Sequence, residues 1–94
     1  MRKAISWRVR GLVMARSYLR DDDRFVCQWC MGRLTEDQVV IDHFEPVARG
    51  GGNDPDNLCV SCARCNAVKS DMPPFEAEIH LNEIFEREAA RNEH

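Results

Sequence analysis

The sequence predicts a small α+β domain with an amphipathic helix at each end and short strands between them. Three observations carry this prediction. Apolar residues recur at helical spacing near both ends, short β-branched runs lie between, and two Cys-x2-Cys pairs frame those runs. A chain of 94 residues buries only a modest core, and such domains often need a staple. We divide this single domain into a basic helix at 1–24, a core at 25–70 and an acidic helix at 71–94.

The charge of the chain is segregated along its length. Residues 1–24 hold seven Lys or Arg against three Asp, whereas residues 71–94 hold two Arg against seven Asp or Glu. A nucleic-acid partner needs a local basic face, and Arg8 and Arg16 in the first segment can supply one. The acidic segment would repel phosphate, so it should face away from a nucleic acid. Both end segments are equally compatible with ordinary solvated helices.

The sequence also bears on the cellular compartment. No apolar run approaches the roughly 20 residues of a transmembrane helix, and arginines interrupt the N-terminal segment, unlike a secretory signal. We therefore expect a cytoplasmic protein with no membrane partner. Thiols stay reduced there, which favours metal binding over disulfides, and the odd count of five cysteines agrees.

The two end helices are predicted from their apolar spacing. The first should run from Ile5 to Arg20 with Ser6 as its N-cap, and it should break at residues 21–23, where three aspartates oppose the helix dipole. Its apolar stripe is Ile5, Val9, Leu12, Val13, Ala15 or Arg16, and Leu19. The last helix begins after Met72 at two prolines, which the first turn of a helix tolerates. Its stripe is Phe75, Ile79, Leu81 or Asn82, Ile84, Phe85 and Ala89.

The core begins with a strand and a knuckle, the short turn between Cys27 and Cys30 whose two thiols can bind a metal. Residues 25–27 read as a short strand that enters the sequence CQWCMGR, in which Gly32 supplies the turn. Residues 38–42 form a second strand. It ends at His43, because Pro46 prevents its continuation as a central strand.

The second half of the core completes a hairpin and a helix. Residues 49–53 must form a loop, since their three glycines give conformational freedom. Residues 58–60 return as a strand, and residues 63–70 form a short helix. The predicted order is therefore strand, long loop, strand, helix.

The cysteines form two pairs, Cys27 with Cys30 and Cys62 with Cys65, separated by 31 residues. Four thiolates can surround one zinc ion tetrahedrally at about 2.3 Å, and the predicted hairpin fits between the pairs. Cys59 also has x2 spacing to Cys62. We prefer the later pair, because the turn into the helix presents it. We interpret Cys59 as a small buried apolar thiol.

Several short motifs follow one another between Cys27 and Lys69. They are Cys-x2-Cys, Asp-His-x2-Pro, Gly-Gly, Asn-Leu and Cys-x2-Cys-Asn-x2-Lys. In this order they resemble the HNH family of endonucleases. The resemblance implies the ββα-metal (His-Me finger) fold with a structural Zn²⁺ on the two cysteine pairs. It also implies a metal-dependent endonuclease that nicks DNA, or cuts it with low specificity, leaving 5′-phosphate and 3′-hydroxyl ends.

The resemblance further implies a role for each matching residue. His43 is the general base, and Asp42 and Asn66 are ligands of a catalytic Mg²⁺ or Mn²⁺. Asn57 ties the loop together and orients the base, and Lys69 contacts phosphate. Asn66 stands where many members have histidine, and its amide oxygen favours a hard cation.

Each of these residues also has a simpler interpretation when taken alone. Asp42 can cap a turn, His43 can be structural, Asn57 can be a turn asparagine and Lys69 can be a solvated lysine. The set in this order and spacing favours the catalytic interpretation for Asp42, His43 and Asn66. The two remaining histidines, His80 and His94, are assigned to the surface.

Two other functions stay open. A non-catalytic zinc module that binds nucleic acid or protein would bind equally well without His43. An accessory subunit of a phage packaging or restriction complex would act only with its partners. One ββα centre cuts one strand, so double-strand cleavage would need two copies, and the apolar stripes of the end helices are candidate surfaces for a homodimer.

Overall fold

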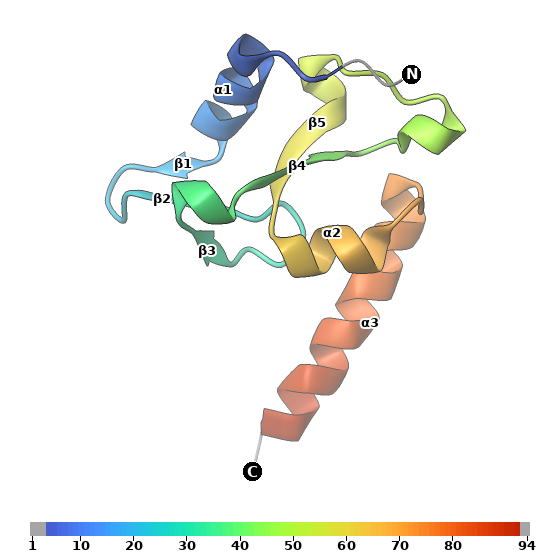
Figure 1. Ribbon diagram of the computed structural model, residues 1–94. Helices are drawn as coiled ribbons and strands as arrows, with labels where there is room; N and C mark the ends of the chain where they lie inside the picture. The colour runs from blue at the N-terminus through green and yellow to red at the C-terminus, as the bar shows by residue number, and fades with distance from the viewer. Residues whose placement is uncertain (1–3, 93–94) are drawn as a thin grey trace.

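The computed structural model describes residues 4–92 and has the predicted α+β class. His94 lies outside these residues. Figure 1 shows the arrangement of the elements. The helices are α1 (Trp7–Arg16), α2 (Ala63–Lys69) and α3 (Pro74–Asn92). The strands are β1 (Tyr18–Leu19), β2 (Arg24–Val26), β3 (Arg33–Leu34), β4 (Val40–His43) and β5 (Leu58–Ser61). No helix in the described range is long and apolar enough to cross a membrane.

The strands form two small antiparallel sheets. One has the order β1-β2-β3, and the other pairs β4 with β5. In the second sheet Asp42 lies opposite Cys59, and His43 lies opposite Leu58. Helix α2 follows β5 directly and packs against β4, so β4, β5 and α2 give the predicted strand–loop–strand–helix unit.

The core lies between this unit and the helices on either side of it. Helix α1 packs against β5, and α2 packs against α3. The C-terminal part of α3 projects away from the rest of the molecule (Figure 1). The buried side chains of the core are Val13, Met14, Cys27, Leu34, Val39, Leu58, Val60, Cys65 and Leu81. Each large apolar side chain buried in this way contributes roughly 1.5–3 kcal/mol.

The first helix ends at Arg16 rather than at the predicted Arg20. Ser6 is its N-cap as predicted, and its hydroxyl accepts from the Val9 N–H at 3.2 Å. Residues 18 and 19 instead pair with β2 in a hairpin, where Asp23 takes a left-handed φ of 51°. The Tyr18 hydroxyl donates to the Asp23 carboxylate at 2.7 Å. The aspartates therefore close a turn between two strands, a possibility that helical periodicity alone did not reveal.

The predicted apolar stripes are partly wrong in both end helices. In α1, Leu12 is 51% exposed while Met14 is buried. In α3, Leu81 of the predicted stripe is buried, but Phe75 is 75% exposed, and Ala77, which the stripe did not include, is buried. The reason is tertiary packing: the small Ala77 permits close approach of α3, which turns the larger residues outward.

The turn of the first knuckle is made by Met31, with a φ of 63°, and not by Gly32. The Met31 N–H donates to the Cys27 carbonyl, and the Cys27 N–H donates to the Gly32 carbonyl, both at 3.0 Å. Gly32 matters for a different reason, since a Cβ there would lie 3.2 Å from the Cys30 sulfur. Strand β3, which follows this turn, was not predicted.

The other boundaries shift by one or two residues. Strand β4 begins at Val40 because residues 36–38 form a 3₁₀ turn, capped reciprocally by Thr35 and Gln38. Strand β5 extends to Ser61, and α2 ends at Lys69. These differences leave the predicted order of the core intact.

Candidate active site

The four paired cysteines come together from the two ends of the core. The sulfur atoms of Cys27, Cys30, Cys62 and Cys65 all lie within 4.8 Å of one another. A tetrahedral zinc ion with bonds of about 2.3 Å places its sulfur ligands roughly 3.8 Å apart. The cluster therefore has the ligand type and the spacing to hold a metal ion.

Backbone amides point at three of these sulfurs. The N–H groups of Gly32, Cys62 and Cys65 donate to the sulfurs of Cys30, Cys27 and Cys62 respectively, each at 3.4 Å. Such bonds favour the thiolate, which is the form that binds metal. They help to position these three sulfurs in the cluster.

The pKa values of these thiols depend on burial, on hydrogen bonds and on the charge of the neighbouring sulfurs. Burial alone would raise the pKa of Cys27, but backbone N–H donors outweigh it and hold that pKa below its usual value. Burial, followed by hydrogen bonding to Cys62 and by neighbouring sulfur charge, raises the pKa of Cys65 far above its usual value. A bound cation would relieve this repulsion, since it stabilises every thiolate at once.

Cys59 stays outside the cluster. It lies on β5 opposite Asp42 and is 4% exposed. Burial, reinforced by the negative charge of Asp42, raises its pKa to about 12. It is therefore the buried apolar thiol that the sequence predicted.

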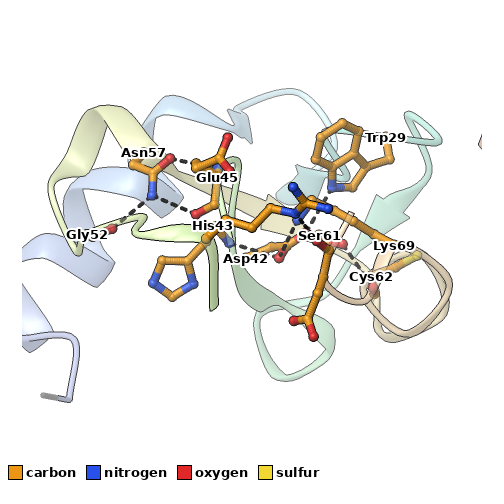
Figure 2. A network of polar contacts seen from close by, with 11 residues as sticks. Trp29, Asp42, His43, Glu45, Gly52, Asn57, Ser61, Cys62 and Lys69 are labelled. Atoms are coloured by element: carbon orange, nitrogen blue, oxygen red, sulfur yellow. Dashed lines mark hydrogen bonds and ion pairs between the residues drawn. The ribbon is translucent and has the colours of Figure 1, made fainter. Parts of the chain in front are cut away.

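Asp42 lies at the centre of a buried polar network. Figure 2 shows Asp42 together with Trp29 and Lys69, two of the residues that it contacts. Its Oδ2 accepts from the Trp29 indole N–H at 3.1 Å, and its Oδ1 accepts from the His43 backbone N–H at 2.8 Å. The Lys69 Nζ lies 3.7 Å from the same Oδ1. The carboxylate is thus oriented by contacts from three elements of the core.

Lys69 is not the solvated lysine of the simpler interpretation. Its side chain is 1% exposed, and its ammonium group lies 5.9 Å from the centre of the Trp29 ring. It occupies the last turn of α2, from which its long side chain runs inward towards Asp42. In this position its charge is directed at Asp42, and its contact with a phosphate stays a prediction.

His43 ends β4 and is half-buried. Its Nε2 lies 2.8 Å from the amide Oδ1 of Asn53. An amide oxygen can only accept, so this pairing favours the tautomer in which Nε2 donates and Nδ1 keeps its lone pair. Asn53 was missed in the sequence, although its place at the end of the glycine-rich loop made it a candidate.

Asn57 ties the long loop to the end of β4. Its side-chain oxygen accepts from the Glu45 N–H at 2.8 Å, and its Nδ2 donates to the carbonyls of Glu45 and Gly52 at 3.1 and 2.9 Å (Figure 2). Gly51 permits this close approach, because a Cβ there would lie 1.8 Å from the Glu45 carbonyl oxygen. The loop-tying contacts predicted for Asn57 are present, and they act on the backbone two residues beyond His43.

One cleft between β4 and α2 collects four of the predicted site residues, Lys69 among them. Asp42, His43 and Asn66 all line it. The remaining lining residues are Pro46, Val47, Lys69, Ser70 and Asp71. Asp71 was not predicted, though a carboxylate two residues after Lys69 was visible in the sequence. The cleft offers carboxylate and amide oxygens, the donors that Mg²⁺ and Mn²⁺ prefer, so these residues fit such an ion.

The two predicted arginines lie on α1, outside the residues that line the cleft. The Arg16 Nη2 donates to the carbonyls of Pro55 and Leu58 at 2.8 and 3.1 Å. Its guanidinium therefore fastens α1 to the end of the loop. Arg8 is exposed and lies 5.3 Å from the centre of the Trp7 ring.

The comparison with protein families gives one clear result for this region. The family model described as HNH endonuclease matches residues 27–72. The matched segment contains both cysteine pairs, the β4-β5-α2 unit and the cleft. A comparison with curated proteins finds no match. The family match confirms the resemblance drawn from the sequence motifs, and that family implies the ββα-metal fold.

Proposed function

We propose that the protein is a metal-dependent endonuclease that hydrolyses DNA phosphodiester bonds, and the premise is the match of the HNH endonuclease family model to residues 27–72. One observation carries the proposal: Asp42, His43 and Asn66 line the same cleft. We expect nicking, or cleavage of low specificity, because one such centre cuts one strand. Double-strand cleavage would then need two copies or a larger complex.

The cysteine cluster serves this site as a structural Zn²⁺ centre in the proposal. Cys62 caps the start of α2, and Cys65 lies one turn further along the same helix. A zinc ion shared with Cys27 and Cys30 would hold α2 beside β4. Asn66 directly follows Cys65, so the clamp would also fix Asn66 in the cleft. Stable zinc–thiolate ligation agrees with a cytoplasmic location, where thiols stay reduced.

The protein's own groups can carry out the proton transfer. His43 accepts a proton at Nδ1 from a water molecule whose oxygen attacks phosphorus, and the bond from phosphorus to the 3′ oxygen breaks. Asn53 holds the imidazole in the required tautomer through Nε2. The departing 3′ oxygen takes a proton from water, which gives a 3′-hydroxyl and a 5′-phosphate. A Mg²⁺ or Mn²⁺ held by Asp42 and Asn66 would supply neutralisation of phosphate charge.

The DNA contacts proposed outside the cleft are on α1. Arg8 is exposed. Arg16 uses Nη2 for two backbone carbonyls, and a guanidinium has further N–H donors that can contact phosphate. The acidic residues of α3 would repel the backbone of DNA and should face away from it.

Supercoiled plasmid tests the proposal directly. The zinc-loaded protein is incubated with Mg²⁺ or Mn²⁺ beside His43→Ala and His80→Ala, each with matched zinc content. His80 is half-buried on α3 and lies outside the residues that line the cleft, so its variant is the matched control. We expect the wild type and His80→Ala to convert plasmid to open circles, and His43→Ala to lose at least about a hundredfold in rate.

Other outcomes would overturn the proposal. If all three proteins shift the plasmid in a gel without cutting it, a non-catalytic binding module explains the chain better. If none binds or cuts, an accessory subunit that needs a partner does. Equal cleavage by wild type and His43→Ala would remove His43 from the reaction.

A further inference from the structure

The most deeply buried charge of the cleft is Lys69. Its side chain is 1% exposed, and the side chain of its partner Asp42 is 8% exposed. A buried ammonium group is stable only beside an opposite charge or another favourable contact. Lys69 has both, since the Asp42 carboxylate lies 3.7 Å away and the face of the Trp29 ring lies 5.9 Å away.

The three members of this network come from three separate parts of the core. Trp29 belongs to the first knuckle, Asp42 to β4, and Lys69 to the end of α2. The separation of 3.7 Å between Nζ and Oδ1 exceeds the usual hydrogen-bond length. The pair is therefore a charge contact whose geometry is set by the elements around it.

Resting on the proposed function, we propose that Lys69 is a resident counter-ion of the metal ligand Asp42. Its ammonium group is the opposite charge that holds the carboxylate in place, and a divalent cation at Asp42 binds against this fixed positive charge. Lys69 is thus a positioning residue that makes the catalytic ion weakly held. Two positive charges within a few ångströms in a poorly solvated cleft repel strongly, so removing one should tighten binding of the other.

Mn²⁺ binding without DNA tests this inference. The background variant is Trp7→Phe, which leaves Trp29 as the only tryptophan. Binding to the zinc-loaded protein is followed by the electron paramagnetic resonance of free Mn²⁺ and by quenching of Trp29 fluorescence. We expect Lys69→Met to bind Mn²⁺ about tenfold tighter or more. Lys69→Arg keeps the charge and is the matched control, with an affinity within about threefold of wild type.

The comparison with Asp42→Asn separates this inference from the proposed function. If Asp42→Asn abolishes Mn²⁺ binding and Lys69→Met leaves it unchanged or weaker, the metal site stands and the counter-ion role is wrong. If Asp42→Asn binds Mn²⁺ as the wild type does, the proposed metal site itself fails. Far-UV circular dichroism and zinc content confirm that each compared variant is folded.

A measurement on unsubstituted Lys69 covers the case in which Lys69→Met does not fold. Mg²⁺ is titrated into the Trp7→Phe protein while nuclear magnetic resonance follows the Lys69 side chain and the Trp29 indole N–H. The inference predicts that both signals move together with one weak affinity. Movement of the Trp29 signal with a stationary Lys69 signal would overturn it.

Discussion

The cysteine cluster and the cleft are neighbouring polar sites that handle charge in opposite ways. The cluster gathers four sulfurs within 4.8 Å of one another and meets them with backbone N–H groups. The cleft instead pairs its buried carboxylate, Asp42, with the buried ammonium of Lys69. The cysteine cluster needs a bound cation to relieve the repulsion between its sulfurs. In the cleft, the charge of Asp42 is balanced by Lys69, which belongs to the protein itself. The two metal ions that we propose should therefore differ widely in affinity and in their effect on folding.

Loss of the metal from the cysteine cluster should have the largest effect. Structural zinc contributes on the order of 10 kcal/mol to small domains, more than a domain of this size can lose. Cys65→Ser, or a strong chelator, should therefore abolish the cooperative thermal transition followed by circular dichroism. Cys59→Ala is the control, because Cys59 lies outside the cluster and should retain zinc. If the Cys65→Ser protein melts like the wild type, the cysteine cluster does not depend on a metal ion for its stability, and the contrast with the cleft is wrong.

The Asp42–Lys69 pair should give the next largest effect. Removing one partner of a buried pair leaves an uncompensated charge and costs about 3–5 kcal/mol. We expect Asp42→Asn and Lys69→Met each to lower the free energy of unfolding by about 3 kcal/mol or more in zinc-loaded protein. The double variant should lose clearly less than both losses combined. Additive losses in urea denaturation would show that the two charges do not compensate each other.

Added Mn²⁺ should affect the stability of Lys69→Met and of the wild type differently. Added to Lys69→Met, it should restore part of the lost stability, since it replaces the missing positive charge beside Asp42. Added to the wild type at the same concentration, it should change stability little.

Asn57→Ala should have an intermediate effect, confined to the loop beside the cleft. The side chain makes three hydrogen bonds to the backbone of Glu45 and Gly52, and leaving such groups unsatisfied costs about 1–3 kcal/mol. We expect about 2 kcal/mol less stability, retained zinc and slower plasmid cleavage. The matched control is Asn82→Ala on the exposed side of α3, which should change stability by under about 0.5 kcal/mol. Unchanged stability in Asn57→Ala would mean that other contacts hold the loop.

The sequence predicted what local patterns determine. Cysteine spacing, the glycine-rich loop and a β-branched run define the β4-β5-α2 unit to within one or two residues at most boundaries. It did not predict which faces of α1 and α3 are buried. The burial of Met14 and Ala77 depends on packing against other elements, which local patterns do not contain. The same limit applies to Tyr18, whose strand exists only because Phe25 pairs with it across the hairpin.

The candidate site shows the same division between local and distant information. The sequence motif predicted Asp42, His43 and Asn66 as site residues, and all three line one cleft. The burial of Lys69 was missed, because it depends on Trp29 and Asp42, which are distant in the sequence. A lysine at the end of a short helix reads as solvated until its partners are known. Long-range charge pairing is therefore the part of this site that sequence patterns do not encode locally.

Cys59 offers the smallest test, since it probes a buried thiol that lies outside the cysteine cluster. Burial raises its pKa from 9.0 to about 12. Below pH 9 the thiol is neutral in both folded and unfolded chains, and its stabilising burial is fully present. As the pH rises from about 9 to 12, the unfolded chain releases the proton while the folded chain keeps it, so stability falls. Between pH 8 and pH 10 the wild type should lose about 1 kcal/mol more than Cys59→Ala in urea denaturation of zinc-loaded protein. An identical loss in both proteins would mean that Cys59 ionises as readily in the folded chain as in the unfolded one. The environment of Cys59 on β5 would then not be the low-dielectric one that its burial indicates.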